Sequence, residues 1–158
     1  MRTLGAAEIA LLAIGCLLTA CAGSGGGGGG ATARPTCKPP ATPTVSFAGN
    51  IQHIFDRSCA LSGCHVPPVP TGPVDLSAGT AYSQTVNVKS AQIPTLKRFD
   101  PGKPDQSYII RKIEGGPNIA GVLMPQGCPG SPLNGARCLS ADDIAAIRQW
   151  VTECALNN

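Results

Sequence analysis

The sequence predicts an all-α domain of about four helices joined by long loops. Apolar residues recur at intervals of three and four in several segments, and no segment gives a clear strand pattern. Glycine and proline are abundant, at 20 and 15 residues, whereas aromatic residues make up only 4%. A domain this rich in loops and poor in aromatics has a thin core, so we expect disulfides or a cofactor to contribute to its stability.

The N-terminus has the features of an export signal, because Arg2 precedes an apolar run over 9–18. Some ten apolar residues are too few to cross a bilayer, which takes roughly 20, but they suit the core of a signal peptide. The run ends in "LTAC", which resembles a bacterial lipobox; an ordinary signal peptide with a chance cysteine is the alternative. We therefore expect a lipoprotein signal peptide over 1–20 and a lipid on Cys21 that anchors the protein to a membrane.

The following segment, 21–44, is Gly-rich and then Pro-rich, and it lacks a core-forming pattern. It predicts a tether between the lipidated cysteine and one folded domain over 45–158. The expected location is the cell envelope, on the periplasmic face or at the outer membrane. The net charge is only +3 and the basic residues are scattered, so we expect no binding of nucleic acid.

Two helices are predicted in the first half of the domain. Ser46 is a suitable N-cap for a helix whose apolar residues recur at helical spacing and which runs straight into Cys59. His53 lies on this helix. A second, weaker helix is predicted over 76–87 with Ser77 as its cap.

Two further helices are predicted in the second half. Pro104 suits the first turn of one helix, which Gly115 ends. The other begins at Ser140, and Asp143 three residues later gives a short capping box. Between them, 116–138 is a long loop, and a loop of this length in a compact domain is usually functional.

The motif that carries most chemical information is Cys59-x4-Cys64-His65. A cysteine followed at once by histidine is typical of c-type haem attachment, although the usual gap between the cysteines is two residues. The chain beyond the signal peptide has one methionine, Met124, which lies in the long loop before Pro125. A thioether is a soft ligand that suits haem iron, and this methionine lies off any apolar stripe that would indicate core packing.

Four other cysteines remain outside the leader and the lipid site, Cys37, Cys128, Cys138 and Cys154. An exported chain keeps its cysteines oxidised or otherwise engaged. Cys128 and Cys138 bracket a short loop and are expected to pair, which leaves Cys37 for Cys154. Four cysteines allow three connectivities, so this pairing is a hypothesis.

The order of these features resembles a class I c-type cytochrome domain, most of all a bacterial exported or lipid-anchored subgroup with C-x4-C-H spacing. The segments that carry the resemblance, spread over about 47–156, are "SFAGNIQHIFDRSCALSGCH", "DPGKPDQSYIIRKIEG", "MP" and "LSADDIAAIRQWV". The resemblance implies a small cytochrome c-like fold around one haem c. Cys59 and Cys64 would form the thioethers, and His65 and Met124 would bind the iron. It also implies that the first helix packs on the last, with Phe47, Ile51 and Phe55 against Ile147, Trp150 and Val151.

We therefore expect a membrane-anchored monohaem cytochrome that exchanges electrons with redox partner proteins, and not an enzyme, because no proton-transfer constellation accompanies the motif. His53 is an alternative axial ligand. The main alternative function is a haem-free, disulfide-stapled lipoprotein that acts as a binding module, with Cys59–Cys64 closing a small loop. A zinc site at Cys59, Cys64 and His65 lacks a clear fourth ligand. A catalytic haem from which Met124 departs has no direct support in the sequence.

Overall fold

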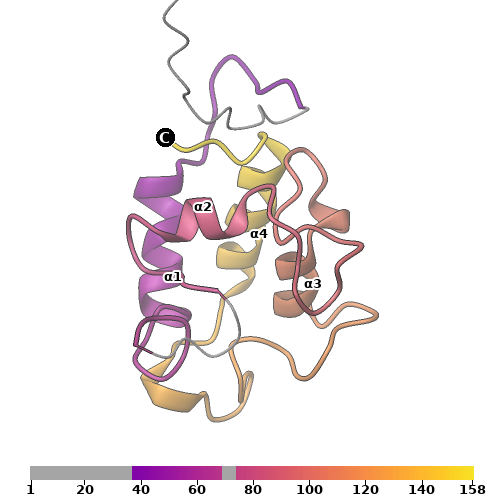
Figure 1. Cartoon of the computed structure of the whole chain (residues 1–158). Coiled ribbons are helices and arrows are strands. Elements are labelled where there is room, and N and C mark those ends of the chain that lie inside the picture. Colours follow the sequence, from indigo (N-terminus) through magenta and orange to yellow (C-terminus); the bar gives the residue numbers. More distant parts are fainter. Residues whose placement is uncertain (1–36, 69–73) are drawn as a thin grey trace, which may run out of the picture. The chain divides into compact units, whose positions relative to one another are not determined.

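The computed structural model describes residues 37–68 and 74–158. The expected signal peptide, Cys21 and the tether as far as residue 36 lie outside these residues. Within the described part, no helix is both long and apolar enough to cross a bilayer. The described residues form four α-helices and no strand, which confirms the all-α prediction. The α-helices are α1 (Gln52–Ser58), α2 (Ala81–Thr85), α3 (Tyr108–Glu114) and α4 (Ala141–Thr152) (Figure 1).

Three short helical turns of other types complete the secondary structure. A π-helical segment over Phe47–Ile51 leads directly into α1. The 3-10 turn over Pro104–Gln106 precedes α3, and the one over Leu133–Gly135 lies in the long loop before α4.

The first helix begins and ends where the sequence predicts. The backbone N–H of Gly49 donates to Ser46 Oγ at 2.8 Å, so Ser46 is the N-cap. At the other end, the backbone N–H of Cys59 donates to the carbonyl of Phe55 at 2.8 Å. The helix therefore delivers Cys59 from a rigid element.

The core lies where the first helix meets α4. Trp150 is 0% exposed, and its ring centroid lies 5.4 Å from that of Phe47 and 5.2 Å from that of Phe99. Its indole N–H donates to the carbonyl of Leu156 at 2.9 Å, so the only polar atom of the buried ring is satisfied. In Figure 1, α4 lies between the first helix and α3, and it contacts both.

The second helix is shorter than predicted, and Ser77 is not its cap. The helix begins at Ala81 after Thr80, which makes no side-chain capping bond. Gly79 has a φ of +82°, in the left-handed region, which a continuous right-handed helix from Ser77 would not allow. The carbonyl of Ser77 instead accepts from the N–H groups of Thr80 and Ala81.

The end of α3 and the start of α4 follow their local signals, whereas the start of α3 does not. Gly115 ends α3 in the left-handed conformation, with φ 74°. Pro104 is separated from α3, because Ser107 is extended and uses its hydroxyl to accept from the N–H of Asp100 at 2.8 Å. At α4 the predicted capping box is present, since Asp143 N–H donates to Ser140 Oγ and Ser140 N–H donates to Asp143 Oδ2.

Two disulfides join Cys37 to Cys154 and Cys128 to Cys138, with Cα–Cα distances of 5.7 and 5.6 Å. They are the pairs that the sequence favours among three connectivities. The first fixes the end of the expected tether to the residues after α4. Among the described residues, contacts with the folded domain therefore begin at Cys37.

Glu153 reinforces this junction. It accepts from the backbone N–H groups of Thr44 and Val45 and from the Thr44 hydroxyl, at 2.6 to 3.1 Å. Burial would raise the pKa of this carboxyl, but these bonds and one from Gln149 outweigh it and lower the pKa to about 2. The ionised carboxylate is thus the form that holds the junction together.

We expect Glu153→Gln to lower the free energy of unfolding at pH 7 by about 2 kcal/mol, a usual value for hydrogen bonds to a charged group. Because the folded pKa lies below the ordinary 4.5, this stabilisation is complete above pH 4.5 and is lost as the pH falls towards about 2. Urea unfolding of both proteins from pH 7 to 2 should show the difference shrinking over that window. Glu114→Gln, at a partly exposed pair with Arg148, is the control and should change stability by less than about 1 kcal/mol. A difference that is constant from pH 7 to 2 would contradict the prediction.

Candidate functional site

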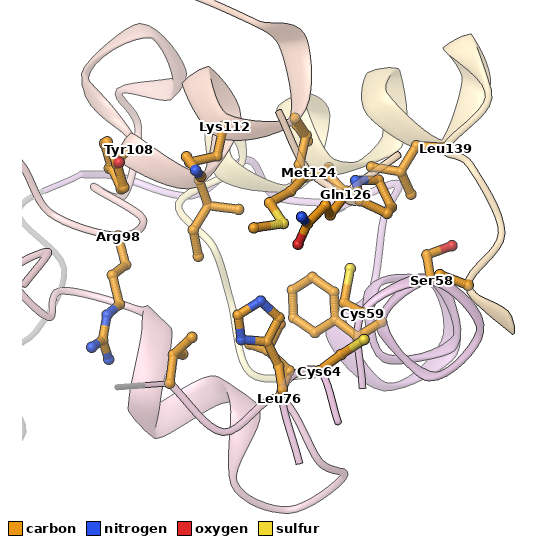
Figure 2. A pocket seen from close by; sticks show the side chains of 18 of the residues that line it. Ser58, Cys59, Cys64, Leu76, Arg98, Tyr108, Lys112, Met124, Gln126 and Leu139 are labelled. Atoms are coloured by element: carbon orange, nitrogen blue, oxygen red, sulfur yellow. The ribbon is translucent and has the colours of Figure 1, made fainter. Parts of the chain in front are cut away.

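A cavity of about 230 Å³ brings together the four residues of the predicted site, Cys59, Cys64, His65 and Met124. The first three come from the end of α1 and the turn that follows it, and Met124 comes from the loop after α3. Figure 2 shows the Met124 sulfur pointing into the cavity from the wall opposite Cys59 and Cys64. Residues that are far apart in the sequence therefore meet at one site.

The segment from Cys59 to His65 folds into a compact turn. The N–H of Cys64 donates to the carbonyl of Leu61 at 2.8 Å, and the N–H of His65 donates to the carbonyl of Cys59 at 3.2 Å. Gly63 has a φ of +74°, and a Cβ there would lie 3.1 Å from the Asn134 amide nitrogen. This turn takes up the four residues between the cysteines and leaves both cysteines and the histidine lining the same cavity.

Cys59 and Cys64 are not joined in a disulfide. Cys59 is half-buried as a residue, but its sulfur is shielded from water, and this burial, followed by the nearby Cys64, raises its pKa to about 12. Because its pKa is raised in this way, the Cys59 thiol is protonated at neutral pH. The other sulfur, Cys64 Sγ, accepts from the Asn134 side-chain N–H at 3.4 Å.

The environment of His65 favours a neutral imidazole. Burial lowers its pKa, the nearby Val74 carbonyl opposes this, and the positive charges of Lys112 and Arg98 lower it further. Although that carbonyl is near, Nδ1 is buried without a hydrogen-bond partner of normal geometry among the described residues. The backbone is fixed, because the His65 carbonyl accepts from the N–H of Leu76 at 2.8 Å. A neutral imidazole is the form that binds metal ions.

Met124 is half-buried, and its backbone N–H donates to the carbonyl of Lys112 at 2.9 Å. The next residue, Pro125, is buried. His53, by contrast, is exposed on α1 and does not line the cavity. The structure thus places Met124 and not His53 opposite the cysteines.

The rest of the cavity wall is mostly apolar, with side chains such as Phe55, Ile113 and Ile147. It also includes Arg98 and Lys112, whereas no aspartate or glutamate is among the described residues that line it. The Arg98 guanidinium donates to the Gln84 carbonyl at 2.6 Å. The cavity is therefore apolar with a positive rather than a negative electrostatic character.

Sequence reasoning missed the polar residues on α3 that face this site, Tyr108 and Lys112. Their spacing of four residues places them on one helix face. The signal was weak, because a lysine on a short helix usually lies in solvent. Only the folded chain brings the loop over 116–138 across this face.

The described residues contain no group of three or more His, Cys, Asp or Glu side chains that could hold a metal ion. Comparison of the chain with models of protein families, with curated proteins and with solved structures finds no match. Any function must therefore be inferred from the cavity and its lining.

Proposed function

We propose that this protein is a monohaem c-type cytochrome that acts in electron transfer. One haem c would be held covalently by Cys59 and Cys64, with His65 and Met124 as the two iron ligands. The observation that carries the proposal is the convergence of these four residues, and of no other described cysteine, histidine or methionine, on one largely apolar cavity.

The chemistry of the cavity suits this group. Haem is a flat apolar ring with two anionic propionates, and the wall combines apolar side chains with Arg98 and Lys112 and no described carboxylate. The neutral imidazole of His65 and the Met124 thioether are the ligand types that such iron takes in electron carriers.

When bound, haem supplies an iron that takes up and releases one electron, and a methionine ligand raises its reduction potential. The chain's own residues hold the group and keep water from it: Phe55, Ile113 and Ile147 form apolar walls. The polar groups of the cavity that could transfer a proton have other partners: His65 would bind the iron, the Tyr108 hydroxyl donates to Gln92, and the Lys112 ammonium donates to two loop carbonyls. This supports electron transfer rather than an enzymatic reaction.

The packing of the first helix on α4, with Phe47 against Trp150, supports a cytochrome c-like fold, since the resemblance implies this helix pair. A lipid on Cys21 would anchor the domain to a membrane of the cell envelope. Its partners would be other redox proteins that meet it there.

The haem-free alternative has less support. It requires Cys59 and Cys64 to close a small disulfide loop, and the structure leaves both thiols unjoined.

The deciding experiment is to produce the protein together with a c-type maturation system and to record its visible spectrum. We expect a sharp alpha band on reduction, and colour that stays with the protein after acid–acetone extraction, which removes non-covalent haem. The intact mass should rise by one haem. A colourless protein would overturn the proposal in favour of the haem-free alternative.

A further inference from the structure

Lys112 is a nearly fully buried lysine, 7% exposed, close to the end of α3. Its ammonium group donates to the carbonyls of Ala120 at 2.9 Å and Val122 at 2.6 Å. Its own backbone carbonyl accepts from the N–H of Met124 at 2.9 Å. These three bonds, which we call the lysine strap, tie one helical residue to three alternate residues of the loop.

The last bond of the strap uses an otherwise free helix carbonyl. Carbonyls in the last turn of an α-helix have no partner within the helix, so they bind whatever the fold brings to them. Here the partner is the backbone of the residue that presents its sulfur to the cavity. Tyr108, one turn earlier, adds a fourth link, because its hydroxyl accepts from the N–H of Ala120 at 3.0 Å and donates to Gln92 at 2.7 Å.

The strap acts on a segment with little rigidity of its own. Gly121 lies between the two carbonyls that Lys112 binds and has a φ of +73°, and Val122 is exposed. The segment is not helical, and Met124 is only half-buried. Without the strap, the conformational entropy of this loop would oppose holding the Met124 sulfur at one point. The sulfur cannot hold itself in place by hydrogen bonding, because a thioether is only a weak acceptor.

Burying an ammonium group is costly, and it persists only where strong acceptors replace its hydration. The hydrogen bonds of Lys112 go to two backbone carbonyls of one loop. If the loop opened, the buried ammonium group would lose both acceptors. Its burial therefore favours the closed position of the loop over α3. A lysine needed only for solubility would lie in solvent.

We infer that Lys112 is a positioning residue for Met124: through the strap it keeps the Met124 sulfur in the cavity and so would exclude competing ligands of the iron. The inference rests on the proposed function. It adds to the predicted site a residue that does not bind the iron but determines how firmly Met124 does.

The test measures how well imidazole, as a competing ligand, binds the oxidised holoprotein. We expect Lys112→Met, which keeps the apolar stem and removes the donors, to bind imidazole about tenfold more tightly, equivalent to about 1.4 kcal/mol. Met124→Ala sets the upper limit. Lys89→Met is the matched control, because Lys89 is exposed and does not line the cavity, and it should bind imidazole like the wild type.

Amide hydrogen exchange at Met124 gives a second readout, which reports on the loop backbone and not on the binding of a competing ligand. The exchange rate of its N–H should rise about tenfold in Lys112→Met, because the loss of the two side-chain bonds to Ala120 and Val122 lets the loop open and break the backbone bond at Met124 more often. Lys112→Gln keeps one donor group and should lie between wild type and Lys112→Met in both measurements. It also serves as the test if Lys112→Met fails to fold.

The outcomes separate the two proposals. If the folded Lys112 variants bind imidazole and exchange the Met124 amide within twofold of wild type and Lys89→Met, the inference is overturned and the proposed function stands. If Met124→Ala itself binds imidazole no better than wild type, Met124 is not the ligand, and both the inference and the assigned ligand pair fall.

Discussion

Replacing both Cys59 and Cys64 by serine is expected to abolish covalent haem attachment, whereas either single replacement should leave haem bound through the remaining thiol. A thioether cannot form without a cysteine sulfur, and both thiols line the cavity and are unjoined. The measurement is the intact mass of each variant after acid–acetone extraction. The expected loss is complete for the double variant, and each single variant should keep one haem.

The matched control is Cys128→Ser/Cys138→Ser, which also removes two sulfurs, but from a disulfide. It should retain covalent haem. Haem that stays on the double Cys59/Cys64 variant would contradict the assignment of the attachment site. Complete loss in Cys64→Ser with normal retention in Cys59→Ser would show that only Cys64 reaches the haem.

The second large effect concerns stability. Replacing Cys37 and Cys154 by alanine should lower the free energy of unfolding by about 5 kcal/mol in the chain-entropy model, because that disulfide closes a loop of more than about 100 residues. The observed sequence separation is 117, against 10 for Cys128–Cys138. The shorter loop should cost only about 3 kcal/mol when opened.

Urea unfolding of the two double variants, both carrying the same bound group as the wild type, gives the comparison. The larger loss is expected for Cys37→Ala/Cys154→Ala, and it should be accompanied by faster proteolysis near the Thr44–Glu153 junction. Equal losses for the two variants would show that loop length is not what determines the stabilisation.

Much of the helical structure could be predicted because its signals are local. The cap at Ser46, the stop at Gly115 and the box of Ser140 and Asp143 each involve residues within three or four positions of one another. Such signals act within one turn of chain and need no tertiary partner. The prediction for α2 was wrong for the same reason: Ser77 looks like a cap locally, but Gly79 takes a conformation that the local pattern does not reveal.

The sequence predicted the four residues that could bind the haem, but not the polar residues that surround them in the cavity wall. Cysteine, histidine and methionine are rare enough that their order singled out Cys59, Cys64, His65 and Met124. Arg98, Tyr108 and Lys112 have common side chains, and nothing in their local pattern indicates that they line a cavity. Arg98 is held by its bond to the Gln84 carbonyl, and Tyr108 and Lys112 bind the loop over 116–138 where it crosses α3.

The sequence by itself therefore determined the helices that carry their own caps and the residue types that could bind haem. Only the tertiary structure decided that His53 is exposed, that Glu153 holds the segment at Thr44, and that Lys112 binds the backbone beside Met124. The physical reason is range: caps and periodicity act within a turn, whereas burial and the strap depend on contacts between segments whose meeting no local pattern encodes.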